Sequence, residues 1–209
     1  MELVELKVRE FMDELASSSP APGGGSVAAV EAAYGASLLA MVCNLTLGRK
    51  KYADYQELAA ETEKKAQNLK EILLLLVDED TAAYNLVSAA YKLPKETDEE
   101  KAYRKSRIQA GLVESCQPPL KVINVAVQGL ELIQSTWKCL NQSCMSDLYV
   151  AAYSLKTGIN GAYANVLINL SGIEDEGYVT ETKEKVKKIV EDSNSLADGL
   201  LEELFARLG

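Results

Sequence analysis

Histidine is absent from all 209 residues of the sequence. The chain therefore cannot form a Ser-His-Asp triad, a Cys-His pair, an HExxH metallopeptidase motif or a histidine-ligated zinc site. Any acid–base chemistry near neutral pH must come from a carboxylate, lysine, tyrosine or thiol whose pKa is moved by its surroundings.

The sequence also has few basic residues relative to acidic ones, and none of its cysteines has the spacing of a known cysteine motif. The 22 Lys and Arg residues against 31 Asp and Glu residues give a net charge of -9, whereas a nucleic-acid-binding domain usually shows a basic surface. The four cysteines form no Cys-x-x-Cys pair and predict reduced thiols. Charged residues interrupt the first 15 positions, which leaves no apolar run for a signal peptide. We expect a cytoplasmic protein that binds no nucleic acid.

Between Gly23 and Gly48 charge is nearly missing, because Glu31 is the only charged residue there. This stretch is nominally long enough to cross a membrane. Alanine, glycine and serine dominate it rather than leucine and isoleucine, so we interpret it as a buried core helix and expect no membrane partner.

Apolar residues recur at steps of three and four along nearly the whole chain, which predicts helices. The expected helices cover Leu3–Ala16, Val27–Leu47, Tyr55–Tyr91, Ala102–Leu140, Ser146–Leu170 and Thr180–Leu208. The fourth should bend or split at Gln117, before Pro118 and Pro119. We predict one all-α domain over residues 1–209, a bundle of about six or seven helices with long central ones. Two nearly uncharged helices need more cover than a small monomer offers, so we also expect a homodimer.

The clearest break in the helical pattern is Ser17–Gly25, which contains two prolines and three glycines. Ser26 follows where an N-cap would stand, before the apolar helix. Free backbone N–H groups at such a helix start attract anions and carbonyls, although an ordinary helix-entry loop has the same composition. The segment is no Walker A loop, since neither a strand nor a Gly-Lys-Ser/Thr element accompanies it.

An acidic residue interrupts the apolar stripe of the long third helix. The stripe contains Leu69, Leu73, Leu76, Asp80, Ala83, Val87 and Ala90. A carboxylate that faces a core must be paired, hydrogen-bonded or partly protonated. Asp80 is therefore either a structural ion-pair partner or a general acid–base with a raised pKa.

Small and polar residues share one face of the expected helix after Ser146. They are Asp147, Ala151, Ser154, Gly158, Gly161, Asn165 and Asn169. Two interpretations fit this face: a close helix crossing, or the wall of a polar cleft. Separately, Arg49, Lys50 and Lys51 form a basic cluster that either binds an anionic ligand or complements a helix end.

These features occur in an order that resembles the cyclodeaminase/cyclohydrolase family. The matching segments are Pro20–Ala29, Met41–Thr46, Gly48–Tyr52, Asp78–Tyr84, Leu93–Lys95, Ser146–Leu148 and Gly161–Leu170. The resemblance covers nearly the whole chain. It implies an all-helical subunit that dimerises and binds a folate in a cleft, with no metal or redox cofactor.

For this sequence the resemblance implies a methenyltetrahydrofolate cyclohydrolase, with Asp80 as the catalytic carboxylate and Asp147 as a residue that orients substrate or shifts the pKa of Asp80. The expected substrate-binding residues are Gly23, Gly24, Gly25, Ser26, Arg49, Lys50, Ser146, Asn165 and Asn169. Two alternatives stay open: a formimidoyltetrahydrofolate cyclodeaminase that releases ammonia, and a non-catalytic folate-binding or helical interaction protein.

Overall fold

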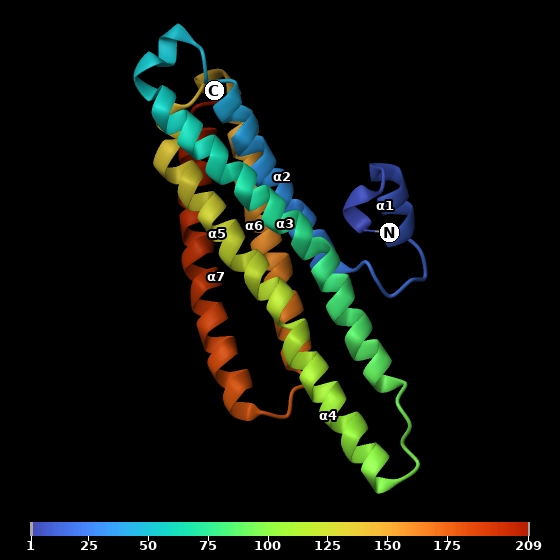
Figure 1. Ribbon diagram of the computed structural model, residues 1–209. Helices are drawn as coiled ribbons and strands as arrows, with labels where there is room; N and C mark the ends of the chain where they lie inside the picture. Colours follow the sequence, from blue (N-terminus) through green and yellow to red (C-terminus); the bar gives the residue numbers. More distant parts are fainter. Residues whose placement is uncertain (1, 209) are drawn as a thin grey trace.

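The computed structural model describes residues 2–208, and they form a helical bundle with no strand (Figure 1). The α-helices are α1 Val8–Leu15, α2 Gly24–Asn44, α3 Gln56–Tyr91, α4 Asp98–Ser115, α5 Gln117–Thr136, α6 Met145–Leu170 and α7 Glu176–Phe205. Four short 3₁₀ segments join or precede them: η1 Leu3–Glu5, η2 Lys50–Tyr55, η3 Trp137–Cys139 and η4 Gln142–Cys144. The all-α prediction is confirmed.

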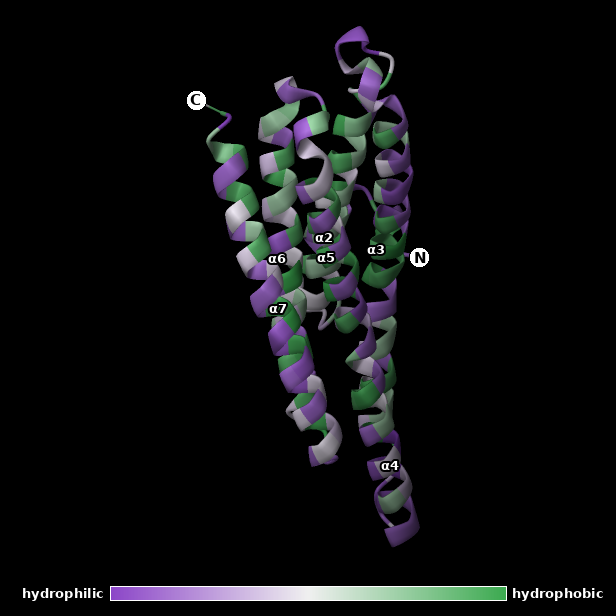
Figure 2. Ribbon diagram, turned by 90° about the vertical axis from the view of Figure 1, so that its left-hand side faces the viewer, coloured by the Kyte–Doolittle hydropathy of each residue, from purple (hydrophilic) through white to green (hydrophobic). Residues whose placement is uncertain are grey.

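Four helices make the centre of the bundle. α2 packs against α3 and α6, and α5 packs against α3 and α6 from the opposite side. α7 lies along α6, while α4 lies along α3. The C-terminal end of α3 and the N-terminal end of α4 extend beyond the other helices in Figure 1. Figure 2 colours that N-terminal end of α4 mainly hydrophilic, in agreement with its charged first turn.

The predicted break before the two prolines is confirmed, but capping side chains start two helices earlier than predicted, so that α4 begins at Asp98 rather than Ala102. α4 ends at Ser115 and α5 begins at Gln117, so the two prolines occupy the first turn of a new helix. Thr97 caps α4, accepting the N–H of Glu100 at 3.1 Å. The last helix begins at Glu176, four residues before the predicted Thr180, because the Asp175 side chain caps it.

The first predicted helix, Leu3–Ala16, is wrong as a continuous element. The chain forms η1 and then turns to extended backbone at Leu6 and Lys7 before α1 begins. The Leu3 N–H donates to the Asp78 carboxylate of α3 at 2.6 Å, which holds the first turn on α3. This contact between residues 75 positions apart is invisible to a periodicity argument.

The prediction of Ser26 as an N-cap is also wrong. α2 starts two residues earlier, at Gly24, with Gly23 in extended conformation at the cap position. Ser26 is fully buried in the first turn, and its hydroxyl bonds to α3 instead of capping its own helix. At the other end α2 stops at Asn44, and Gly48 takes the left-handed conformation (φ 74°) that favours glycine.

By length and composition α2 would be able to cross a membrane, and it is the one such helix within residues 2–208. In the bundle, 61% of its most apolar window is buried. Its small residues pack against α6, where a Cβ added at Gly158 would lie 2.8 Å from the Ala28 carbonyl oxygen. The apolar composition of α2 is therefore that of a core helix.

Candidate functional site

A cleft of about 340 Å³ opens where the N-terminal end of α2 meets α3, α4 and α6. Its walls include six of the residues predicted from the sequence: Gly23, Gly24, Gly25, Asp80, Asn165 and Asn169. These residues come from three segments that are far apart in the chain. The fold therefore brings the glycine loop, the interrupting carboxylate and the polar end of α6 into one site.

Asp80 lies directly against the backbone of α2. A Cβ added at Gly25 would stand 2.2 Å from the Asp80 Oδ1, so only glycine leaves room for the carboxylate. The Ser26 hydroxyl donates to the other oxygen, Oδ2, at 2.9 Å. The same hydroxyl lies 3.2 Å from the Val77 carbonyl oxygen and 3.2 Å from the Thr81 hydroxyl. Ser26 is thus a buried support for Asp80 rather than a residue of the cleft wall.

Two opposing effects set the protonation of Asp80. Burial raises its pKa above the ordinary value, while the hydroxyl and backbone N–H of Ser26 lower it, and burial outweighs them. The carboxylate has no ion-pair partner within residues 2–208, so the structural ion-pair interpretation of the interrupted stripe does not hold. A carboxylate of this kind, in a cleft and with a raised pKa, is suited to take a proton and return it.

The two asparagines of α6 form the opposite wall. The Asn165 Nδ2 donates to the Gly161 carbonyl at 2.9 Å, and the Asn169 Nδ2 donates to the Ser115 carbonyl at 2.7 Å. These bonds fix the orientation of both amide groups. The amide oxygen of each is an acceptor that a ligand can use. An added Cβ at Gly24 would lie 3.3 Å from the Asn165 Nδ2, so the glycine loop faces this wall closely.

Several cleft residues were not predicted as site residues. They are Pro20, Ala21, Tyr84, Val87, Leu112, Ser115 and Ile168. Tyr84 and Val87 follow Asp80 at helical spacing on the same face of α3. The spacing that identified Asp80 would therefore also have indicated these two residues. Leu112 and Ser115 belong to α4, and only the tertiary packing brings them here.

The remaining predicted residues lie at the other end of the bundle. Arg49 and Lys50 are exposed at the start of η2, in the loop near the C-terminus in Figure 1. Ser146 and Asp147 lie in the first turn of α6, close to the same loop, since Asp147 and Arg49 both act electrostatically on Cys144. Eighteen residues of helix separate Asp147 from Asn165, which is about 27 Å at 1.5 Å per residue. The predicted coupling of Asp147 to Asp80 is therefore wrong within one chain.

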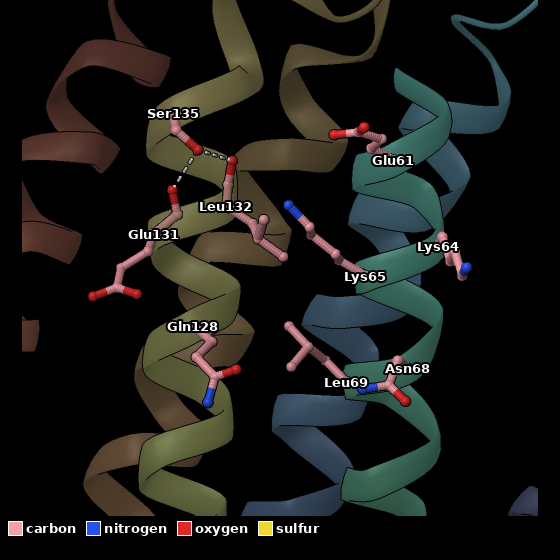
Figure 3. A pocket seen from close by; sticks show the side chains of 9 residues that line it. All are labelled: Glu61, Lys64, Lys65, Asn68, Leu69, Gln128, Glu131, Leu132 and Ser135. Atoms are coloured by element: carbon pink, nitrogen blue, oxygen red, sulfur yellow. Dashed lines mark hydrogen bonds between the residues drawn. The ribbon is translucent and has the colours of Figure 1, made fainter. Parts of the chain in front are cut away.

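A larger hollow, of about 620 Å³, lies between α3 and α5 (Figure 3). Lys65 and Gln128 point toward the gap, and the Ser135 hydroxyl is bonded to carbonyls of its own helix. None of its lining residues was predicted from the sequence to belong to a site. The larger volume does not make this hollow the candidate site, because the side chain suited to acid–base chemistry, Asp80, lies in the smaller cleft.

Two buried thiols, Cys43 and Cys116, do not compete with Asp80 for a catalytic role. All four cysteines are free, which fits the prediction of reduced thiols. Burial raises the pKa of Cys43 to about 12 and that of Cys116 to about 11, so both are neutral packing groups near pH 7.

Comparison with known proteins places the chain in a family. Residues 7–188 match the family model described as formiminotransferase-cyclodeaminase. The chain is 34% identical over 201 residues to a protein named methenyltetrahydrofolate cyclohydrolase from Methylorubrum extorquens, covering 96% of this chain and 97% of that one. It is 37% identical over 205 residues to formimidoyltransferase-cyclodeaminase from Rattus norvegicus, but spans 38% of that protein's length.

A solved structure agrees with this assignment. The crystal structure of formiminotetrahydrofolate cyclodeaminase from Thermotoga maritima superposes with a TM-score of 0.82 at 26% identity. The match covers 99% of this chain and 98% of that chain. Both the sequence relatives and the structural relative thus extend over almost all of the bundle, including the cleft.

Proposed function

We propose that this chain, which belongs to the formiminotransferase-cyclodeaminase family and is an enzyme of folate metabolism, hydrolyses 5,10-methenyltetrahydrofolate to 10-formyltetrahydrofolate. The observation that carries the proposal is the Asp80 carboxylate, held by Ser26 in a polar cleft with its pKa raised by burial. The similarity over the full length of a cyclohydrolase supports the choice of reaction.

The first step of the proposed reaction is attack by water on the bridging carbon. This carbon joins N5 and N10 in a cationic, amidinium-like group and is therefore electrophilic. As the oxygen bonds to the carbon, Asp80 accepts a proton from the water, and a neutral carbinolamine forms. General-base help of this kind typically contributes about 10²–10⁴-fold to the rate.

The second step breaks the bond between the bridging carbon and N5. Asp80 returns its proton to N5 as the bond breaks, and the carbinol hydroxyl loses its proton to solvent as the formyl C=O forms on N10. One proton is released overall, which balances the conversion of a cation to a neutral formamide. A single carboxylate that changes protonation state during the cycle is sufficient for both transfers.

The asparagine wall supplies recognition in this proposal. The amide oxygens of Asn165 and Asn169 are positioned to accept hydrogen bonds from the N–H groups of the pterin ring, because their Nδ2 atoms are already bonded to backbone carbonyls. The first backbone N–H groups of α2, behind Gly23, face the same cleft as donors.

Formimidoyltetrahydrofolate cyclodeamination is the second candidate, favoured by the names of the rat and Thermotoga relatives. There N10 attacks the carbon of the protonated formimino group and ammonia leaves, so the same carboxylate would take the N10 proton and pass it to the leaving nitrogen. The two reactions share 5,10-methenyltetrahydrofolate, as substrate in one and as product in the other. One cleft is therefore able to serve both.

A direct assay separates these reactions. Hydrolysis removes the near-UV absorbance of 5,10-methenyltetrahydrofolate, in a buffer where the spontaneous reaction is slow. We expect an enzyme-dependent loss that is proportional to protein concentration. Appearance of the same absorbance from 5-formiminotetrahydrofolate, with ammonia release and no hydrolysis of the methenyl compound, would replace the first proposal with the second. Tight folate binding without either change would favour a non-catalytic binder.

A further inference from the structure

The side chains that line the Asp80 cleft fall into a polar group and an apolar group. The polar group contains Asp80 and the two asparagines of α6, which the proposed function assigns to the bridging carbon and the pterin. The apolar group contains Tyr84, Val87, Leu112 and Ile168. None of these four side chains takes part in the proposed chemistry, so their gathering in the same cleft needs an explanation of its own.

Three of the apolar residues form a continuous wall that begins one helical turn beyond Asp80. Tyr84 and Val87 lie about 6 Å and about 10 Å farther along the axis of α3, on the same face as the carboxylate. Leu112 joins them because α4 lies along α3. A Cβ added at Gly111 would lie 3.2 Å from the Val87 Cγ2, so the two helices are in close contact at this level. We call Tyr84, Val87 and Leu112 the apolar wall.

The Tyr84 ring is available to a ligand. Its side chain is 40% exposed. Within residues 2–208 the aromatic pairs are Tyr149 with Tyr153 and Tyr149 with Phe205, so the Tyr84 ring belongs to neither. Ile168, on the α6 side of the cleft, is 67% exposed. Large apolar side chains that gather around a cleft and remain open to solvent are typical of a ligand-binding surface.

The substrate of the proposed reaction has an aromatic group for which the polar residues of the cleft have no use. A p-aminobenzoyl ring is bonded directly to N10, and N10 is bonded to the bridging carbon. When the bridging carbon lies at Asp80, this ring therefore lies close by along the cleft. The pterin requires hydrogen-bond partners, whereas the faces of the benzoyl ring are best covered by apolar atoms.

On the basis of the proposed function, we infer that Tyr84 is a specificity-determining residue, whose ring stacks against the aromatic ring on N10, with Val87 and Leu112 completing the contact. Aromatic pairs in offset-stacked or edge-to-face arrangements gain more than their buried area alone predicts. Binding of the ring at the apolar wall holds the bridging carbon beside Asp80. Tyr84 thus selects a substrate with an aryl group on N10 and takes no part in proton transfer.

Tyr84→Ala tests the contact in the hydrolysis of 5,10-methenyltetrahydrofolate. Alanine is a strong helix former, so α3 should stay folded. We expect KM to rise about 10–100-fold with kcat within about threefold of the wild type, since a contact made equally in ground and transition states changes KM alone. Tyr84→Phe keeps the ring and should keep the wild-type KM.

Tyr103→Ala is the matched control for this test. It removes a tyrosine that is 60% exposed on α4 and lies outside the lining of the cleft. Its KM should equal that of the wild type. An unchanged KM in Tyr84→Ala would overturn the inference. An equal rise in Tyr84→Phe would also overturn it, because the hydroxyl rather than the ring would then make the contact.

Two ligands separate loss of the ring contact from a general disturbance of the cleft. 10-Formyltetrahydrofolate carries the benzoyl ring, whereas 6-methyltetrahydropterin lacks it. We expect Tyr84→Ala to raise the Kd of the first about 10–100-fold and to leave the Kd of the second unchanged, measured by calorimetry and by ligand-observed NMR. An equal rise in both Kd values would mean that Tyr84 supports the cleft as a whole and would overturn the inference.

Failure of this inference differs from failure of the proposed function. If the wild type turns over neither folate substrate, the Kd of 10-formyltetrahydrofolate replaces KM as the readout. A rise in Tyr84→Ala, without a rise in Tyr84→Phe or Tyr103→Ala, would then support the ring contact although the proposed reaction is wrong. Normal turnover with the same KM in all of these proteins would contradict the ring contact and leave the proposed reaction intact.

Discussion

The two halves of α6 contain the same kinds of residue but do different things. In the first half, Ala151 and Gly158 form a close crossing with α2, where added side-chain atoms would collide with backbone. In the second half, Asn165 lies against the first residue of α2, Gly24, and together with Asn169 it lines the cleft. Both interpretations of this face were thus right, each for one half of the helix.

The difference arises from the partner that each half meets. Ala28 and Ala32 of α2 have small side chains, so α6 approaches closely and excludes water. α2 begins at Gly24, and the extended chain before it leaves a space that the asparagine side chains of α6 line without filling. A buried amide requires partners, and the Gly161 and Ser115 carbonyls supply them. The point where α2 begins therefore separates the part of α6 that packs against α2 from the part that lines the cleft.

We expect the largest effect from a change at Asp80 of α3, the proposed catalytic carboxylate of the cleft. Asp80→Asn keeps the size of the side chain and removes its proton chemistry, so kcat should fall about 10²–10⁴-fold. Asp78→Asn, two residues away on another face of α3, is the matched control and should retain kcat. Steady-state hydrolysis of 5,10-methenyltetrahydrofolate measures both. Equal kcat values for the two variants would remove Asp80 from the mechanism.

Gly25→Ala tests the close approach of α2 to Asp80. The new Cβ would stand 2.2 Å from Oδ1 and must displace the carboxylate. We expect kcat to fall about 10–100-fold, since misplacing a catalytic group by about 1 Å costs about 10²-fold. Thermal unfolding should change little, because alanine favours the helix by about 1 kcal/mol. A large loss of stability with normal kcat would show that Gly25 serves packing alone.

Gly158→Ala tests the crossing half of α6. Its Cβ would meet the Ala28 carbonyl oxygen at 2.8 Å and the Ala32 amide nitrogen at 3.0 Å, both backbone atoms. We expect a loss of about 2 kcal/mol in the free energy of unfolding, measured by urea denaturation. Gly199→Ala, with no atom within 4 Å in α7, is the control and should gain up to about 1 kcal/mol. A neutral Gly158→Ala would contradict the tight crossing.

Ser26→Ala should have the smallest effect, visible in the pH dependence. Ser26 lowers the pKa of Asp80, so its removal raises that pKa further. The reaction needs ionised Asp80, and the acid limb of the kcat/KM profile should therefore move to higher pH by less than about one unit. At pH values above the acid limb, Ser26→Ala and the wild type should have nearly the same kcat/KM. An unchanged limb would mean that the hydroxyl does not support the carboxylate.

The pKa shift also predicts how stability depends on pH. A folded-state pKa of Asp80 above the unfolded value means that the native chain holds this proton more tightly, so Asp80 favours folding at low pH and opposes it once pH exceeds the folded pKa. Asp80→Asn should therefore raise the melting temperature at pH 8 relative to the wild type more than it does at pH 4.

Periodicity and chain breakers predicted most of the fold. The bounds of α3 and the break between Ser115 and Gln117 follow from apolar spacing and two prolines. The split of the first helix was missed, because it depends on the contact between Leu3 and Asp78. Local pattern thus predicted the long helices, whereas the start of the chain also involves the tertiary contact of Leu3 with Asp78 and the capping of α1 at Lys7 by Glu10.

The site was predicted in part, for a geometrical reason. A residue that interrupts an apolar stripe, such as Asp80, is identified by its face alone. Asp147 and Asn165 share one face of α6, but eighteen residues of helical rise put them about 27 Å apart, so a shared face alone was no reason to assign both to one site. No sequence pattern indicates that α4 contributes to the cleft, because Leu112 and Ser115 reach the cleft only through the packing of the helices.

The most direct test of the central claim is the titration of the Asp80 carboxyl carbon by ¹³C NMR, assigned by its absence in Asp80→Asn. We expect this signal to titrate at higher pH than other aspartates and to shift when 10-formyltetrahydrofolate is added. An Asp80 signal that titrates in the ordinary aspartate range and stays unchanged on addition of folate would contradict the account.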